Sequence, residues 1–436
     1  IPWNCCSGAG GKMPYDEIRA KRVRDFVQCL KHTKGEFHGK PFKLLPWQEK
    51  IINDVFGTVR DEDPTMRQFS QVYIEIGKKN GKQLSLDTPI PTISGWKTMG
   101  EMAVGDTVFD ELGQPCRVLG LSAVDDTETC YRITFRDGSH IDAGEGHLWQ
   151  VQVINNGNRS KLLTTGEIYR KIIAFRERHH GKKDALRSLV RIPVAGAIHI
   201  PAQNLPLEPY VYGYWLGNGH AVNPELTVRT CDKDRIMENI PYPISSMWMQ
   251  KGGGSVVLRV PALKPLLLTS FRDKVIRPEY LRASQAQRWA LLQGLMDSDG
   301  CISTVKSQSV YVSTIAQLAE SVRELLWSLG IKNAMTLSPS TRYGAATGET
   351  LYTIRFTIFE DQPTSRLQRK SERDRPRTKE TRSCFHYIRD IEPLPHPVPM
   401  RCLQVDSPSR LYLAGPSFVP THNSELGAAL ALNMLV

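Results

Sequence analysis

The sequence predicts a mixed fold in which an all-β unit is split by an inserted α+β unit and pieces of an α/β unit flank both. Short β runs separated by turn signals fill residues 83–203 and return at 385–423. Between them, residues 204–362 mix helical and strand patterns and carry two Gly/Asp-rich motifs. A chain of 436 residues is long enough for two to four domains of this kind.

The composition is that of ordinary globular protein, with 40% hydrophobic and 23% charged residues. No apolar run approaches membrane-spanning length, no signal peptide is visible, and the first residue is Ile1 rather than Met, as in a fragment. A net charge of +11 favours a polyanionic partner, usually nucleic acid. The nine cysteines include no CxxC pair, so the sequence favours a reducing cytoplasm and indicates neither a disulfide scaffold nor a zinc site.

The first flank, residues 1–82, reads as two helices and a strand. A basic amphipathic pattern predicts a helix over 14–34, and a second helix follows Pro46-Trp47-Gln48 and ends near Phe56. The apolar run 71–76 then predicts a strand that leads into a Gly/Lys loop.

That loop looks like a phosphate-binding loop that has been cut in two. Residues 77–82 read Gly-Lys-Lys-Asn-Gly-Lys, and residues 424–436 begin with a serine and form a strong helical pattern. Joining Lys82 to Ser424 gives strand, loop and helix, the order in which a P-loop binds phosphates and Mg²⁺. Residues 83–423 therefore look like an insertion. It ends in His422-Asn423 before a hydroxyl residue, as a self-excising segment requires.

Both ends of this insertion resemble the Hint domain of inteins. The opening run is 83–90 with Gly95-Trp96 and 104–106, and the closing runs are 401–407 and 418–423. The resemblance implies a horseshoe-like all-β domain that performs protein splicing without a cofactor.

The first inserted residue differs from that of the commonest inteins, which begin with Cys or Ser. Gln83 carries an amide, which is not a nucleophile near neutral pH. Cys402 stands where most inteins have Asp, and the minor group called class three inteins uses a cysteine there together with a Trp and a Thr. Trp149 and Thr421 match those two positions, whereas Gly144 stands where a Thr usually precedes the histidine.

The class three resemblance implies that Cys402, as a thiolate, attacks the Lys82 carbonyl and forms a thioester. Arg401, beside Cys402, is expected to favour the thiolate. His147 is expected to bind the Lys82–Gln83 amide and protonate the leaving amine.

The downstream end is expected to complete the reaction. Ser424 takes over the acyl group as an ester, and Asn423 cyclises onto its own carbonyl, which His422 polarises. The freed amine of Ser424 then displaces the ester and leaves a normal peptide bond to Lys82. Proximity replaces any external energy source.

The two Gly/Asp-rich motifs, 212–220 and 292–300, resemble those of LAGLIDADG homing endonucleases. The resemblance implies a double-stranded DNA site as partner and Mg²⁺ as cofactor. Asp299 occupies the place of the acidic Mg²⁺ ligand in the second motif, and Asn218 replaces it in the first. Lys274 matches the basic residue of the family between the motifs.

The flanks resemble the ATPase of the terminase large subunit of tailed phages, and a helicase or another P-loop protein is the alternative host. The resemblance implies that Gln48 contacts adenine, and that Lys78, Gly81, Lys82 and Ser424 hold the phosphates and Mg²⁺ of ATP. Ile76 stands where the first loop glycine usually lies. After splicing, the expected partners are the rest of the terminase and phage DNA, in the cytoplasm of a bacterial host, and no membrane.

The expected domains are the N-terminal flank 1–82, the first part of the Hint domain 83–203, the endonuclease-like domain 204–362, a basic linker 363–384, the second part of the Hint domain 385–423 and the C-terminal flank 424–436. Two other functions remain open from the sequence. One is a free-standing DNA endonuclease with an inactive splicing domain, and the other is a nucleotide-binding motor protein with a structural insertion.

Overall fold

The computed structural model describes residues 14–30, 41, 44, 46–69, 71–76, 83–153, 159–178, 189–303, 308–342, 345–358, 363–373, 382–423 and 428–433. The chain divides into two compact units, Ile1–Lys78 with Gly427–Val436, and Lys79–Leu426. No helix within the described ranges combines the length and the apolar character that crossing a membrane requires.

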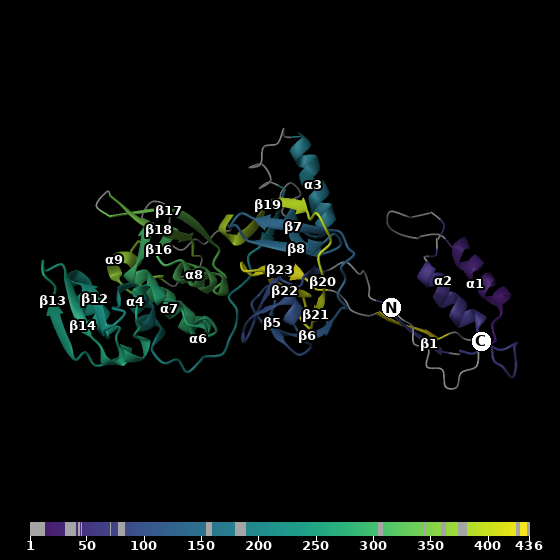
Figure 1. The fold of residues 1–436 in the computed structure, drawn as a ribbon, viewed down its shortest axis with the longest axis horizontal. Coiled ribbons are helices and arrows are strands. Elements are labelled where there is room, and N and C mark those ends of the chain that lie inside the picture. Colours follow the sequence, from purple (N-terminus) through teal and green to yellow (C-terminus); the bar gives the residue numbers. More distant parts are fainter. Residues whose placement is uncertain are drawn as a thin grey trace. The chain divides into compact units, whose positions relative to one another are not determined.

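The first unit contains the two predicted helices. Helix α1 spans Glu17–Cys29, and the Asp16 side chain caps it by accepting from two backbone N–H groups of its first turn. Helix α2 spans Pro46–Ile52 and continues as a π-helical turn over Asn53–Gly57. Both helices lie where the sequence predicts them (Figure 1).

The helix predicted after residue 424 is wrong. Residues Ala428–Asn433 form strand β24, which pairs antiparallel with β1, Gln71–Ile76, from Gln71 opposite Asn433 to Ile76 opposite Ala428. Helix propensity is a weak preference, and the backbone groups of β1 offer an edge that pairs with a short neighbouring segment. The predicted strand at 71–76 is confirmed.

The second unit begins with a β-rich domain, as the fold class predicts. Eight strands pair in the order β10-β9-β11-β19-β7-β8-β2-β20, five in the order β21-β6-β5-β3-β4, and β22 with β23. The first part of the chain supplies β2 Leu84–Ser85, β3 Pro89–Thr92, β4 Gly95–Thr98, β5 Thr107–Phe109, β6 Pro115–Leu121, β7 Cys130–Phe135, β8 His140–Gly144, β9 Leu148–Val153, β10 Arg159–Thr164, helix α3 Thr165–Arg178 and β11 Val190–Pro193.

The last part of this domain comes from the far end of the insertion. It supplies β19 Phe385–Pro393, β20 Met400–Arg401, β21 Leu403–Val405, β22 Leu411–Ala414 and β23 Val419–His422. Strand β19 pairs with β7 and β11, and β20 pairs with β2. Segments 83–193 and 385–423 therefore build one set of sheets around a shared apolar core.

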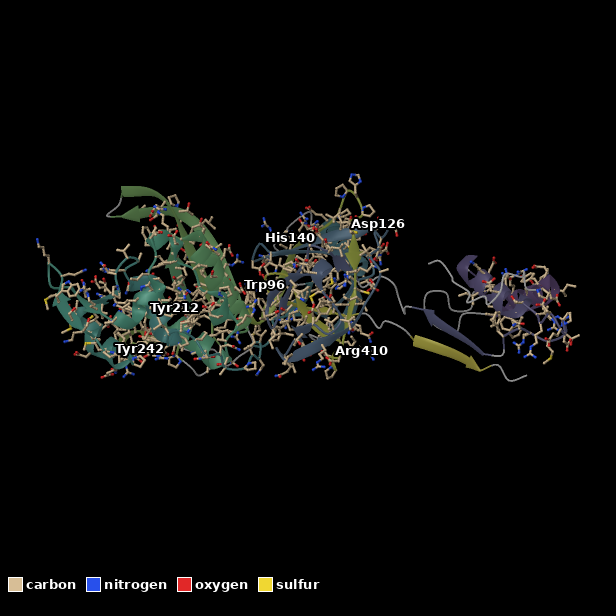
Figure 2. All side chains as sticks on the ribbon, turned by 60° about the horizontal axis from the view of Figure 1, so that its bottom comes forward. Trp96, Asp126, His140, Tyr212, Tyr242 and Arg410 are labelled. Carbon is tan, nitrogen blue, oxygen red and sulfur yellow. The ribbon has the colours of Figure 1, made fainter. Side chains whose placement is uncertain are left out.

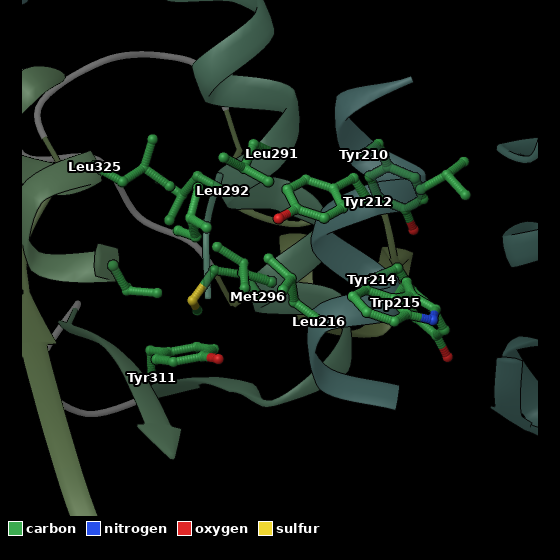
Figure 3. Packing of buried hydrophobic residues seen from close by; sticks show 14 of the residues in the cluster. Tyr210, Tyr212, Tyr214, Trp215, Leu216, Leu291, Leu292, Met296, Tyr311 and Leu325 are labelled. Carbon is green, nitrogen blue, oxygen red and sulfur yellow. The ribbon is translucent and has the colours of Figure 1, made fainter. Parts of the chain in front are cut away.

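The other domain of this unit is α+β and centres on two helices, α4 Pro209–Asn218 and α7 Gln285–Ser298. They touch at glycines: a β-carbon on Gly294 would lie 2.1 Å from the Tyr210 carbonyl oxygen, and one on Gly213 would lie 2.3 Å from that of Leu291. Figure 3 shows the aromatic side chains of α4 beside Leu291, Leu292 and Met296 of α7. The two Gly/Asp-rich motifs therefore lie on a pair of packed helices.

Two sheets and several short helices complete the α+β domain. The sheets run in the orders β12-β14-β13 and β15-β16-β18-β17. Their elements are β12 Glu225–Arg229, α5 Lys233–Glu238, β13 Ser246–Met249, β14 Ser255–Arg259, α6 Pro278–Leu281, β15 Gly300–Ser303, β16 Gln308–Ser313, α8 Ala316–Ser328, β17 Asn333–Arg342, β18 Ala345–Phe356 and α9 Gln368–Ser371.

The described start of the expected basic linker, residues 363–373, packs into this α+β domain. Thr364, Ser365 and Leu367 are buried. The Asp297 carboxylate of α7 accepts from Arg366 N at 3.1 Å and also from the Ser365 hydroxyl. Reading these residues as a linker is therefore wrong, because their polar groups are satisfied by partners distant in sequence that composition does not reveal.

Buried contacts join the α+β domain to the β-rich domain. The fully buried guanidinium of Arg288 donates to the carbonyls of Ser328 and Ile198, and its Nε donates to that of Ala283 at 3.0 Å. Trp327 of α8 stacks on His386 of β19 with ring centroids 5.0 Å apart. Trp96 of the β-rich domain, labelled in Figure 2, lies under the guanidinium of Arg282 at 5.7 Å.

Candidate functional site

The register of two short strands places Cys402 beside the start of the insertion. Strand β2 pairs with β20 so that Leu84 is opposite Arg401 and Ser85 is opposite Met400. Gln83 precedes Leu84 and Cys402 follows Arg401, so the two residues adjoin the same end of this two-residue ladder. The backbone of Cys402 is held by Ser122, which donates N–H to its carbonyl and accepts from its N–H, both at 3.0 Å.

Gln83 is buried and held by both its backbone and its side chain. Its carbonyl accepts from Gly144 N at 3.0 Å, and its Nε2 donates to Asp125 Oδ2 at 3.4 Å. Asp125 in turn bridges to Met400, with both N–H···O distances at 2.8 Å. Gln83 is therefore fixed in the protein interior by Gly144 and Asp125.

His147, Trp149 and Thr421, which the sequence analysis singles out, lie together. Nε2 of the buried His147 is hydrogen-bonded to Thr421 Oγ1. The rings of His147 and Trp149 meet edge to face at 4.8 Å, and Trp149 Nε1 donates to Thr165 Oγ1 at 3.0 Å. The bond between His147 and Thr421 links strand β23, which precedes the downstream junction, to the turn 144–147, whose Gly144 N–H binds Gln83.

At the downstream junction, the ring of His422 binds the carbonyl that would have to be attacked. His422 Nδ1 donates to the Asn423 carbonyl oxygen at 2.7 Å, which fixes the proton on that nitrogen. Asn423 Nδ2 donates to the Val405 carbonyl at 3.1 Å, and Asn423 N donates to the Arg410 carbonyl at 2.7 Å. The Asn423 Oδ1 atom is buried without a hydrogen-bond partner in the described part of the chain. Asn423 is thus held through its carbonyl, its side-chain amide and its backbone N–H.

Two residues near Cys402 differ from expectation. Arg401, expected to favour the thiolate, instead directs its guanidinium to the carbonyls of Gly100 and Met102. Tyr412, which the sequence did not single out, has a buried hydroxyl without a hydrogen-bond partner among the described residues. Burial raises the pKa of Tyr412, and the charge of a Cys402 thiolate would raise it further. Tyr412 also faces Thr421 across the β22–β23 hairpin.

The second candidate site lies where α4 and α7 end. A β-carbon on Gly217 would lie 2.7 Å from Asp299 Oδ2, so the Asp299 carboxylate sits against the last turn of α4, which carries Asn218. Burial raises the pKa of Asp299, and the cations of Lys274 and Lys370 lower it. Asn218 Nδ2 donates to Tyr214 OH at 3.3 Å.

Two buried lysines occupy equivalent places at the ends of these helices. Lys274 Nζ donates to the carbonyls of Trp215 and Gly219, at 2.8 and 2.7 Å. Lys370 Nζ donates to those of Met296 and Gly300, at 2.7 and 2.8 Å, the matching positions of the second motif. Burial lowers the pKa of both, that of Lys274 to about 8. The sequence analysis missed Lys370, and the signal was a lysine following each motif.

The predicted nucleotide site cannot be assembled from the described residues. Gln48 lies in α2, and its side chain falls outside the description. Lys78, Gly81, Lys82 and Ser424 also lie outside the described residues. The described residues contain no group of three or more His, Cys, Asp or Glu side chains that could hold a metal ion.

Comparison with known proteins gives one family match and several partial likenesses. Residues 286–355 match the model of the LAGLIDADG-like domain. A "Replicative DNA helicase DnaB" from Mycobacterium intracellulare is 32% identical over 364 residues, which is 80% of this chain and 59% of that protein. The chain therefore spans less than two thirds of the length of this relative.

Among solved structures, the MchDnaB-1 intein is 15% identical, with a TM-score of 0.25 over 78% of this chain and 99% of that one. The homing endonuclease I-DmoI in complex with DNA and Mn is 16% identical, with a TM-score of 0.25 over 35% of this chain and 89% of that one. TM-scores of this size do not establish a shared fold.

Proposed function

We propose that the chain splices itself, excising residues 83–423 and joining Lys82 to Ser424. The observation that supports this proposal most is the pairing of β2 with β20, because Gln83 and Cys402 adjoin the same end of that ladder. A cysteine thereby adjoins the ladder end from which Gln83, the first residue to be excised, begins.

At the upstream junction, Cys402 is the first nucleophile, in the manner of class three inteins. Its sulfur bonds to the Lys82 carbonyl carbon, the Lys82–Gln83 bond breaks, and Gln83 leaves as an amine. The contact of His147 with Thr421 supports a role for both in holding the two junctions in one site. Ser424 then receives the acyl group and releases the Cys402 thiol.

At the downstream junction, Asn423 Nδ2 attacks the Asn423 carbonyl carbon, and the bond to Ser424 breaks. The hydrogen bond from His422 Nδ1 polarises that carbonyl and stabilises the charge that develops on its oxygen. The bond from Nδ2 to Val405 O orients the attacking amide. The freed amine of Ser424 then displaces its own ester.

The mass of the purified chain tests this function. Splicing yields two species, the excised segment and the joined flanks, whereas a free-standing endonuclease or a motor protein with a structural insertion leaves one chain of 49.1 kDa. A single species of that mass after prolonged incubation, with the fold intact by circular dichroism, would overturn the proposal.

Gln83→Ala is expected to splice within about threefold of the wild-type rate. The substitution removes only the side-chain bond to Asp125, while the backbone bond from Gly144 remains. A long hydrogen bond of this kind contributes about 1 kcal/mol or less. The measurement is the rate of appearance of ligated flanks by mass spectrometry. Loss of all upstream cleavage in a folded Gln83→Ala chain would contradict the Cys402 route.

We also propose that the α+β domain binds double-stranded DNA and has weak endonuclease activity. The match of residues 286–355 to the LAGLIDADG-like domain supports this proposal. Asp299, with Asn218 on the neighbouring helix, would hold Mg²⁺, which would stabilise negative charge at a scissile phosphate when bound. The donor set fits Mg²⁺ only in part, because a neutral amide replaces one of two carboxylates.

Asn218→Asp is expected to raise Mg²⁺-dependent cleavage of a mapped target DNA by about tenfold or more, because a second carboxylate strengthens metal binding. The measurement is single-turnover cleavage at several Mg²⁺ concentrations. Asn239→Asp, at a helix end in the same domain, is the matched control and should leave cleavage unchanged. Equal cleavage by the wild type and Asn218→Asp would show that position 218 is not a metal ligand.

The host of the insertion is proposed to be a P-loop ATPase. The name of the mycobacterial relative favours the helicase alternative, whereas Pro46-Trp47-Gln48 supports the terminase one. ATP-dependent unwinding of duplex DNA by the full spliced host would select the helicase, and ATP-dependent packaging of DNA would select the terminase.

A further inference from the structure

The carboxyl group of Glu128 fills the space beside Gly144, next to the upstream junction. A β-carbon built on Gly144 would lie 2.5 Å from Glu128 Oε2 and 2.7 Å from Glu128 Cδ. Contacts below 3.0 Å do not occur for real β-carbons, so any larger residue at position 144 would displace the carboxyl. The glycine and the glutamate therefore form one arrangement.

This arrangement is connected directly to the first inserted residue. Gly144 N donates to the Gln83 carbonyl at 3.0 Å, and the Gly144 carbonyl accepts from His147 N at 3.0 Å. Glu128 Oε1 accepts from Gly146 N at 2.9 Å. Glu128 thus closes the turn whose first residue binds Gln83 and whose last residue is His147.

The second oxygen of the Glu128 carboxyl group takes no part in closing this turn. Glu128 Oε2 is buried and has no hydrogen-bond partner within the described residues. Burial raises the pKa of Glu128 against the lowering effect of the Gly146 N–H, and the negative charges of Asp125 and Glu145 raise it further. The Cys130 thiol faces the same residue and donates to the Glu128 carbonyl at 3.0 Å. A carboxyl group in these surroundings keeps its proton to higher pH and can act as a general acid.

We propose that Glu128 donates the proton that the leaving amine of Gln83 requires in the first step of splicing. The inference rests on the proposed splicing function. The Cys402 thiol loses its proton to solvent, and the thiolate forms the C–S bond to Lys82. As the C–N bond breaks, its electron pair takes the proton of Glu128. The Glu128 carboxylate recovers a proton from solvent, so thiol and amide become thioester and amine.

The ring of His147 contacts the strand of the other junction through one of its nitrogens. Its Nε2 is bonded to Thr421, on the strand that leads to the downstream junction. A division of work follows, in which Glu128 serves the upstream bond and His147 holds the two junctions together.

Glu128→Gln in the full chain tests this role, because glutamine keeps the shape and the acceptor for Gly146 but has no acidic proton. At the lowest pH at which the wild-type chain splices, upstream cleavage, trapped as a thioester with excess thiol, should slow by at least about a hundredfold. The deficit should shrink as pH rises through the pKa of Glu128, since the wild-type acid then loses its own proton. Downstream cleavage at Asn423 should keep its wild-type rate.

Glu392→Gln is the matched control. Glu392 is an exposed carboxylate on β19 of the same domain, so both cleavages should be unchanged. An upstream rate in Glu128→Gln equal to wild type, or a loss of both cleavages together, would overturn the role of Glu128 and leave the splicing function standing. A wild-type chain that never splices would overturn both.

Discussion

Replacing Cys402 with alanine is expected to abolish both the thioester and the ligated flanks. The residue that follows Arg401 at the end of the β2–β20 ladder then carries a methyl group, which cannot attack the Lys82 carbonyl. Removal of a catalytic nucleophile lowers a rate by at least about three orders of magnitude. Cleavage after Asn423 should persist, because His422 and Val405 hold that residue through contacts that do not include the thiol.

Two further variants sharpen this experiment. Cys402→Ser should react much more slowly than wild type, since a hydroxyl is far less ionised than a thiol near neutral pH. Cys116→Ala is the matched control, because Cys116 and Cys402 are both 6% exposed in the same β-rich domain. Burial raises the pKa of Cys116 to about 12, which makes it an inert thiol. Cys116→Ala should splice normally.

The readout is mass spectrometry of the purified variants, with a thiol added to capture thioesters. If Cys402 is only a small core residue, its alanine variant will lose about 1 kcal/mol of stability and still give ligated flanks at near wild-type yield. That result would require withdrawal of the class three assignment.

Asn423→Ala is expected to block release at the downstream junction while the branched ester accumulates. The variant lacks the amide nitrogen that lies 3.1 Å from Val405 O and must attack the neighbouring carbonyl. Cleavage after position 423 should fall by at least about three orders of magnitude, as for loss of any reacting group. Hydroxylamine should then free the N-terminal flank from the accumulated ester, and the masses identify it.

Asn333→Ala is a control for the loss of a buried asparagine, because Asn333 lies in the α+β domain with its amide bonded locally. It should splice normally. Ligated flanks from Asn423→Ala would show that cyclisation of Asn423 does not release the insertion.

Much of the fold was predictable because its signals are local. Short β runs separated by turn residues predicted the β-rich domain, and mixed helical and strand patterns predicted the α+β domain. The segment after residue 424 failed because its alanines and leucines favour a helix only weakly, whereas β1 offered backbone partners. Residues 363–373 failed because a basic composition does not reveal buried partners such as Asp297.

Residues of the candidate site were predictable where they belong to a known motif. They were not predictable where their chemistry depends on groups that lie beside them only in the fold. His147, Trp149 and Thr421 are separated by up to 274 positions, and only the family pattern joined them before the structure did. Glu128, Tyr412 and Lys370 carry no motif. These residues stand out because they are buried and because the fold brings carbonyls or glycines beside them. Neither property can be read from a single sequence.

The buried contacts of Arg288 give the α+β domain a structural role that does not depend on nuclease activity. Burial lowers the pKa of Arg288 to about 9, and its guanidinium binds carbonyls from both domains rather than a carboxylate. Deletion of the α+β domain would remove Arg288, the hydrogen-bond donor to the Ile198 carbonyl. It would also expose the ring face of His386 that Trp327 covers. An asparagine in place of the acidic residue at position 218 weakens only the cleavage of DNA. Natural selection can therefore retain the domain for the stability of its neighbour even after nuclease activity is lost. An engineered minimal splicing domain would need new residues at both contact points.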